Sequence, residues 1–97
     1  MATYISLVNY TDQGIKTIKD SPSRVDAVRA LAESLGGRMT QLFLTMGDYD
    51  LVAISELPDD EAAAKFALAI GSAGNVRTKT MRAFGEDQMR EIISSLP

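Results

Sequence analysis

Segments with strand-like and helix-like patterns follow one another along this chain in an order that few folds can accommodate. Four segments rich in β-branched and aromatic residues predict strands, and the apolar spacing between them predicts two long helices. The strands are expected at 3–10, 38–46, 50–56 and 76–84, and helices at 21–35, 59–70 and, last in the chain, 86–96. This order predicts an α+β protein in which each long helix connects two strands of one sheet.

A β-hairpin is predicted between the two middle strands. Gly47, within Met46-Gly47-Asp48-Tyr49, can supply the positive φ that a tight turn requires. Two right-handed crossovers joined through this hairpin give a ferredoxin-like βαββαβ fold, with a four-stranded antiparallel sheet of order 4-1-3-2 and both long helices on one face. A short helical stretch is also expected at 14–19, after the N-cap that Thr11-Asp12 offers.

Cysteine and histidine are both absent from the chain, which removes many kinds of site. Without cysteine there is no disulfide, thiolate nucleophile, iron–sulfur cluster or zinc–thiolate site. Without histidine there is no Ser-His-Asp or Cys-His catalytic machinery and no imidazole metal site. We therefore expect no cofactor and no tightly bound transition metal, while a Mg²⁺ or Ca²⁺ site built from carboxylates alone stays open.

The charge of the chain argues against nucleic acid as a partner. The net charge is −3 and the pI about 4.8, and the basic residues are scattered except for Arg77, Lys79 and Arg82. A nucleic-acid-binding protein needs a concentrated basic surface to displace counterions from the phosphates. The chain also shows neither a signal-peptide pattern nor an apolar run of about 20 residues that could span a bilayer, so we expect no membrane association and a cytoplasmic location.

If both long helices cover one face of the sheet, the other face is left bare. Alternation along the strands predicts that the bare face carries the apolar residues Tyr4, Val8, Tyr10, Phe43 and Phe84, among the polar residues Ser6, Gln41, Thr78 and Thr80. A surface this apolar is unfavourable in water. We therefore expect a homodimer or a larger homo-oligomer that pairs two sheets face to face.

The sequence resembles the GYD-domain family of small bacterial and archaeal proteins, named for a Gly-x-Tyr-Asp segment that is found here as Gly47-Asp48-Tyr49-Asp50. The likeness covers nearly the whole chain, so residues 1–97 are predicted to form a single domain of this family. The other matching segments are Tyr10-Thr11-Asp12-Gln13-Gly14, Arg24, Gly36-Gly37, Pro58-Asp59-Asp60-Glu61-Ala62, Gly74-Asn75-Val76-Arg77-Thr78 and Arg82-Ala83-Phe84. The resemblance implies a ferredoxin-like fold of the dimeric α/β-barrel type. It implies no established activity, so no catalytic residue is carried over.

The segment Asp48-Tyr49-Asp50 is one candidate for chemistry, because it brings two carboxylates and a phenol close together. A structural interpretation competes with it: Asp48 suits the turn, and Tyr49 can pack at the end of the sheet. Asp50 is the member with the stronger case for contacting a ligand.

Topology suggests a second candidate that includes Asp50. With the first and third strands taken as parallel and the fourth antiparallel to the first, Tyr4, Asp50 and Arg82 share one end of the sheet. Strands lie about 4.8 Å apart, which places Asp50 and Arg82 roughly 10 Å apart across the first strand. They could form a structural ion pair, or bind an anion together with Tyr4, Thr80 and Tyr49.

These observations favour a homo-oligomeric module that binds a small anionic or aromatic molecule between the sheet and its partner. One alternative is a cofactor-independent enzyme, similar to the isomerases or monooxygenases of the dimeric α/β-barrel type. In a chain without histidine, the tuned acid or base of such an enzyme would have to be Asp50, Tyr49 or Tyr4. The other alternative is an interaction protein whose dimer surface is its whole function.

Overall fold

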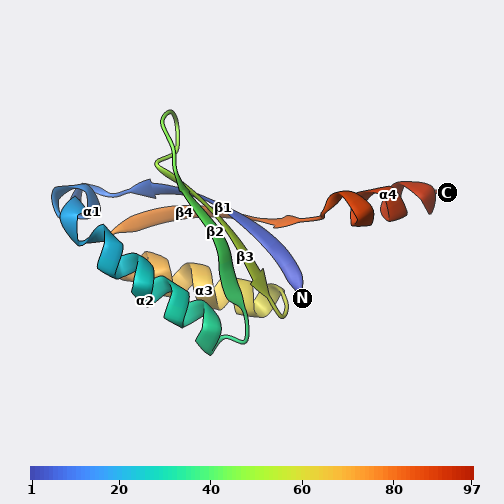
Figure 1. The fold of residues 1–97 in the computed structure, drawn as a ribbon, viewed down its shortest axis with the longest axis horizontal. Helices are drawn as coiled ribbons and strands as arrows, with labels where there is room; N and C mark the ends of the chain where they lie inside the picture. Colours follow the sequence, from blue (N-terminus) through green and yellow to red (C-terminus); the bar gives the residue numbers. More distant parts are fainter.

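The computed structural model describes all residues from 1 to 97 and has the predicted order of elements (Figure 1). The strands are β1 (Ala2–Tyr10), β2 (Arg38–Leu44), β3 (Leu51–Leu57) and β4 (Val76–Ala83). The helices are α1 (Asp12–Lys16), α2 (Ser21–Ser34), α3 (Asp60–Ser72) and α4 (Glu86–Ser94), with a 3₁₀ turn at Ile18–Asp20. Both middle strands are shorter at the hairpin than predicted, and the stretch expected at 14–19 is divided between α1 and the 3₁₀ turn.

The sheet has the order β2-β3-β1-β4, which confirms the predicted order 4-1-3-2 and the ferredoxin-like α+β fold. Every neighbouring pair is antiparallel, including β1 with β3. The expectation that the first and third strands are parallel was therefore wrong. The α2 crossover makes β2 parallel to β1, and the hairpin then reverses the chain, so β3 must run against β1.

The assignment of strand faces was also wrong for β1, and for Thr78 and Thr80 of β4, which align with Val8 and Ser6 of β1. Tyr4 is only 4% exposed and lies in the core cluster with Ala32, Leu57, Ala63 and Phe66, below α2 and α3. The even-numbered residues of β1 therefore face the helices, not the bare side. Both sets of residues on β1 are largely apolar, so alternation alone did not show which set is covered.

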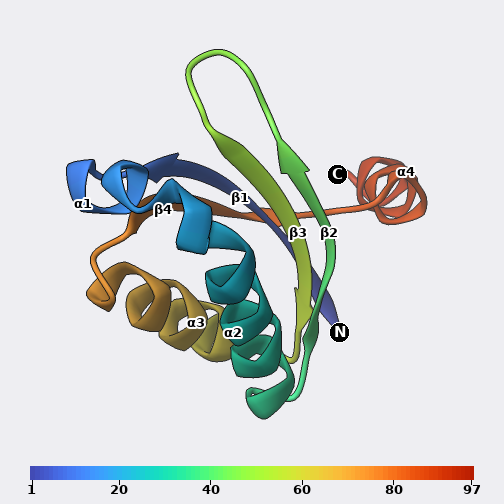
Figure 2. The same ribbon diagram turned by 60° about the vertical axis from the view of Figure 1, so that its left-hand side comes forward.

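The other face of the sheet is open in this chain, as Figure 2 shows with α2 and α3 both on one side. Cross-strand register aligns Ile5 with Ile54 and Met81, and Leu7 with Val52. At the edge, Phe43 on β2 lies opposite Val52 and is 52% exposed. We call these six residues the open face: Ile5, Leu7, Phe43, Val52, Ile54 and Met81.

Several predicted turns and caps have the expected geometry. Gly36, which follows α2, has φ 85° and Gly47 in the hairpin has φ 131°, both in the region that favours glycine. Thr11 caps α1, because its Oγ1 accepts a hydrogen bond from the backbone N–H of Gly14 at 3.1 Å. One irregularity was not predicted: the register of β2 shifts between Met39 and Gln41, which leaves Thr40 in a bulge.

The last helix, α4, projects from the end of β4 away from the sheet and from the other helices (Figure 1). All of its residues are exposed, among them the apolar residues Met89, Ile92 and Ile93. A helix with one apolar side is ordinarily covered by another element, and here none of the chain's own elements covers it. No helix of the fold combines the length and the hydropathy needed to cross a bilayer.

Candidate binding cavity and the polar cluster beside it

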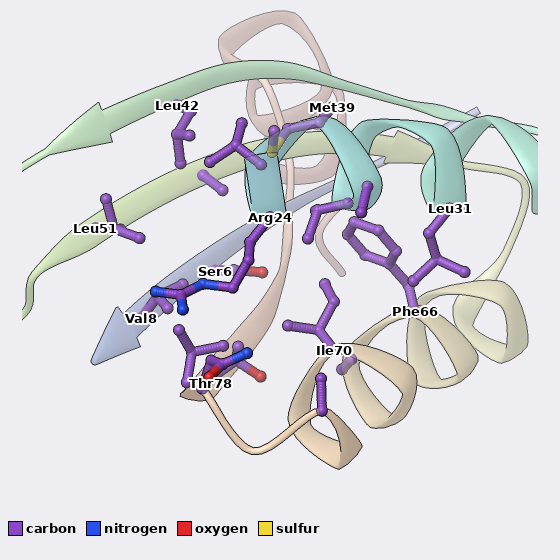
Figure 3. Close-up of a pocket in the computed structure, with 18 of the residues that line it drawn as sticks. Ser6, Val8, Arg24, Leu31, Met39, Leu42, Leu51, Phe66, Ile70 and Thr78 are labelled. Carbon is purple, nitrogen blue, oxygen red and sulfur yellow. The ribbon is translucent and has the colours of Figure 1, made fainter. Parts of the chain in front are cut away.

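A cavity of about 260 Å³ separates the sheet from the two long helices (Figure 3). Its walls are mostly apolar and come from all four strands and from α2 and α3. Phe66 and Leu31 line it from the helices, and Val8, Met39 and Ala53 line it from the strands. α3 contributes the small side chains of Ala67 and Ala69 to these walls.

Two hydroxyls and the one cation of the cavity lie where β1 ends and α2 begins, and Ser6, Thr78 and Thr80 add hydroxyls along the strands. The hydroxyl of Tyr10, the last residue of β1, lies 2.9 Å from the hydroxyl of Ser21, the first residue of α2. Arg24 is one turn further along α2 and also lines the cavity. In Figure 3 its side chain extends from the helix along the cavity. The cavity therefore carries its one charge at this end, which we call the polar end, and its remaining walls are mostly apolar.

Arg24 is the only charged residue among those that line the cavity, and it is half-buried. Its guanidinium donates one hydrogen bond to Thr17 Oγ1 at 2.9 Å and one to the carbonyl oxygen of Gly14 at 3.2 Å. The three ion pairs of the protein join other residues, so no carboxylate neutralises Arg24. A half-buried cation without a counter-charge is costly unless an anion joins it.

A second hollow, also about 260 Å³, lies on the outer side of α3 and shares Ala67 and Thr80 with the cavity. It contains Tyr4, whose hydroxyl donates a 2.5 Å hydrogen bond to Asp60 Oδ1 at the start of α3. Arg82 lies over the Tyr4 ring, with 5.8 Å between the guanidinium carbon and the ring centre. We call Tyr4, Asp60, Thr80 and Arg82 the polar cluster.

Tyr4, at the centre of the polar cluster, has a perturbed pKa. Burial, reinforced by the hydrogen bond to Asp60 and by the negative charge of that carboxylate, raises the pKa of Tyr4 to about 12, against a lesser lowering effect of Arg82. At neutral pH the phenol is therefore protonated and donates to Asp60. A raised pKa makes it a poorer general base, so Tyr4 is tuned for holding a hydrogen bond and not for removing a proton from a substrate.

Three of the five predicted ligand-binding residues, Tyr4, Thr80 and Arg82, do come together in the structure. They lie on the helix-covered side of the sheet, however, because Tyr4 aligns with Arg82 and Ser6 aligns with Thr80 on that face. The predicted position of these residues on the bare face was wrong. Arg82 is exposed at the rim, where it also stacks on Phe84 at 4.5 Å.

Asp50 and Tyr49 lie at the opposite end of the sheet from Arg82. Leu51 aligns with Val8, near the end of β1, whereas Arg82 aligns with Tyr4 near its start. Asp50 accepts a 2.9 Å hydrogen bond from the backbone N–H of Tyr10, and Tyr49 packs under Lys79, whose Nζ is 5.7 Å from the ring centre. The predicted pairing of Asp50 with Arg82 was wrong, because it rested on a parallel alignment of β1 and β3.

Two residues of these sites were not predicted as site residues. Asp60 falls in the first turn of the helix expected at 59–70, and the adjacent Asp59 caps α3 by accepting a hydrogen bond from the Ala62 N–H. Arg24 carried a usable signal, because it precedes Val28 and Leu31 by four and seven residues on one face of α2. A charged residue on the apolar side of a helix points into the interior, where charged side chains are rare unless they have a partner.

The four-stranded ferredoxin-like sheet and its hairpin place this chain in a class of small α+β proteins. Comparison with known families identifies the family within that class. A family model described as the GYD domain matches residues 4–93, so the chain belongs to the GYD domain family. A similar protein from Thermus thermophilus, called "Glutamine synthetase and cystathionine beta-lyase binding protein", is 33% identical over 84 residues, covering 86% of this chain and 88% of that one.

Solved structures agree with the fold. TTHA0845 from Thermus thermophilus aligns with a TM-score of 0.56 and 28% identity, covering 88% of this chain and 95% of its own. A feast or famine regulatory protein from M. tuberculosis, solved in complex with L-methionine, aligns with a TM-score of 0.67 over 88% of this chain and 51% of its own. Its identity is 14%, so that likeness supports the architecture alone.

Proposed function

We propose that this protein is a homo-oligomeric binding protein that docks on an enzyme of amino-acid metabolism. The observation that carries the proposal is the amount of apolar surface that the chain leaves uncovered in two places, on the open face and along α4. Uncovered apolar surface of this extent is typical of protein–protein contact sites. Two distinct surfaces suit two partners, a second copy of the chain and an enzyme.

The open face suits a second copy. Its residues come from all four strands, and Phe43 and Met81 are 52% and 47% exposed. Two such sheets can pack face to face around a shared apolar layer. A symmetric pair of identical surfaces closes on itself, which gives a dimer and not a growing chain.

The enzyme partner is suggested by the similar protein from Thermus thermophilus, whose name gives glutamine synthetase and cystathionine beta-lyase as its partners. At 33% identity over most of both chains, we take an enzyme of this kind as the partner to test first. The apolar side of α4 is the surface that we assign to this contact. Helix-in-groove docking uses apolar residues spaced three and four apart, as Met89, Ile92 and Ile93 are.

A second candidate function, binding of a small molecule, is favoured by the cavity between the helices and the sheet. Its volume of about 260 Å³ and its single cation, Arg24, are features of a ligand site. This site would lie inside one protomer, not between the sheet and its partner. The enzymatic alternative has less support, because the pKa of Tyr4, one of its candidate acid or base residues, is raised away from neutrality.

The oligomer is tested by placing charge on the open face. Phe43→Glu combined with Met81→Glu changes two exposed positions, so the monomer should still fold, whereas a buried dimer interface should not tolerate the charges. Light scattering during size-exclusion chromatography should give a multiple of 10.5 kDa for the parent and 10.5 kDa for the variant. Leu68→Glu, at a 74% exposed position on α3, is the matched control and should leave the oligomer intact. A monomeric parent would refute the oligomer.

Enzyme docking is tested by calorimetry with purified glutamine synthetase and purified cystathionine beta-lyase. The parent and Leu68→Glu should bind at least one of them, and Ile93→Glu, which places a charge at a 56% exposed position on α4, should not. If the parent binds neither enzyme, the docking function is wrong. If Ile93→Glu binds as well as the parent, the assignment of the contact to α4 is wrong.

A further inference from the structure

We propose that the cavity between the helices and the sheet binds a monocarboxylate with an apolar body, and that Arg24 holds its carboxylate. The inference rests on the small-molecule function and specifies its ligand class. It joins the two observations already described, the largely apolar wall and the one cation at the polar end.

The volume limits the size of the ligand. A cavity of about 260 Å³ lies near the lower end of the size range of small-molecule sites. An alkyl chain of medium length or a phenylalkyl group suits a site of this size. The residues at the apolar end, Phe66 and Leu31, offer no hydrogen-bonding side chain to a polar ligand body.

The polar end is built to receive a negative charge. A guanidinium has five N–H donors, of which Arg24 uses one for Thr17 and one for Gly14. Those two bonds hold the guanidinium at the start of α2 and leave the other donors for a ligand. The fork of an arginine matches the two oxygens of a carboxylate.

The surroundings of Arg24 add neutral donors and no competing acid. The hydroxyls of Tyr10 and Ser21 are close to each other at this end, so either can donate to a carboxylate oxygen. No aspartate or glutamate lines the cavity, so an anion there would meet no like charge. A ligand that carries an ammonium group would instead face an unneutralised guanidinium and be repelled.

The test uses ligands that share one apolar body and differ in the head group. Octanoate, octanol and octylammonium are titrated into the full-length parent by calorimetry, and ¹H–¹³C methyl spectra locate the site. Octanoate should bind, octanol should bind about tenfold or more weakly because it lacks the charge-assisted hydrogen bonds, and octylammonium should not bind. Methyl shifts should fall on cavity residues such as Val8 and Ile70 and not on Ile5 or Val52 of the open face.

Two substitutions then test whether Arg24 contacts the carboxylate of the ligand. Arg24→Met keeps an apolar side chain of similar length and should weaken octanoate binding about tenfold or more. Arg29→Met removes an exposed cation from the same helix, outside the cavity, and should leave binding unchanged. Circular dichroism of both variants checks that α2 is preserved.

The outcomes separate this inference from the function on which it rests. If octanol binds the parent as tightly as octanoate, or if folded Arg24→Met binds octanoate as tightly as the parent, the carboxylate inference is overturned and the cavity remains a site for apolar molecules. If none of the three ligands binds the parent, the small-molecule function itself is overturned. Methyl shifts confined to the open face would mean that octanoate binds outside the cavity. Both the carboxylate inference and the small-molecule function of the cavity would then be overturned.

Discussion

Filling the cavity should make the protein more stable and less able to bind a ligand. Ala53 is the residue to change, because it lies on β3, is 7% exposed and lines the cavity between its cross-strand neighbours Ser6 and Leu42. Ala53→Val adds two methyl groups on the side that faces the empty volume. A natural core packed to normal density would be overfilled by such a change, whereas a cavity of about 260 Å³ can accept it.

The magnitude follows from the size of the added groups. Two methyl groups buried at about 0.8 kcal/mol each would stabilise the fold by about 1.6 kcal/mol. The restricted rotamers of valine and imperfect contacts reduce this value, so we expect a net gain of about 1 kcal/mol in the free energy of unfolding. For a domain of this size, that gain corresponds to a rise of about 4–8 °C in Tm.

The assay is equilibrium urea denaturation of Ala53→Val and the parent, with the m-value checked for constancy. Ala83→Val is the matched control: it makes the same change on β4 at a position that lines neither hollow, so it measures the effect of valine on a strand outside the cavity. Ala53→Val should exceed this control in stability and should bind octanoate more weakly than the parent. A loss of stability in Ala53→Val beside a neutral Ala83→Val would refute the reasoning, because it would mean that the space is not available.

Two further predictions concern stability alone. Because the folded state holds Tyr4 at a pKa of about 12 against the ordinary 10.0, its contribution to stability is complete below pH 10 and is lost as the pH rises toward 12. In urea denaturation at a series of pH values, the parent should therefore lose stability over that interval more steeply than Tyr4→Phe, and equal slopes would contradict this. Gly14→Ala should destabilise by about 1–3 kcal/mol, since its Cβ would lie 1.9 Å from the carbonyl oxygen of Asn75, whereas Gly71→Ala meets no atom within 4 Å and should not destabilise. Thermal melting of the two glycine variants checks this, and a Gly14→Ala protein as stable as the parent would disprove the close contact.

The order of elements and of strands could be predicted because it depends on local pattern and chain connectivity. Apolar spacing located α2 and α3, and the hairpin glycine located the turn between β2 and β3. Strand direction could also have been predicted, since a crossover followed by a hairpin leaves β3 antiparallel to β1. The face of β1 could not be predicted in this way, because Ile5 and Leu7 on one side are as apolar as Tyr4 and Val8 on the other.

The candidate site was predictable only in part. Tyr4 and Arg82 are cross-strand partners, so the correct register between β1 and β4 is enough to bring them together. The partner of Tyr4 was not predictable, because Asp59 and Asp60 are equally suited to begin a helix and only the docking angle of α3 turns Asp60 toward the phenol. The cavity depends on how far α2 and α3 stand from the sheet, which residue spacing does not determine.

The bulge at Thr40 affects how copies of this chain can assemble. It lies on β2, which together with β4 forms the outer margins of the sheet, where unpaired backbone groups could recruit another strand. The bulge interrupts the regular spacing of those groups on β2, and the other outer strand, β4, carries the charged residues Arg77, Lys79 and Arg82. Growth strand by strand into a continuous fibre is disfavoured at both margins. The proposed dimer would therefore form through the open face, since neither margin of the sheet favours the addition of a further strand.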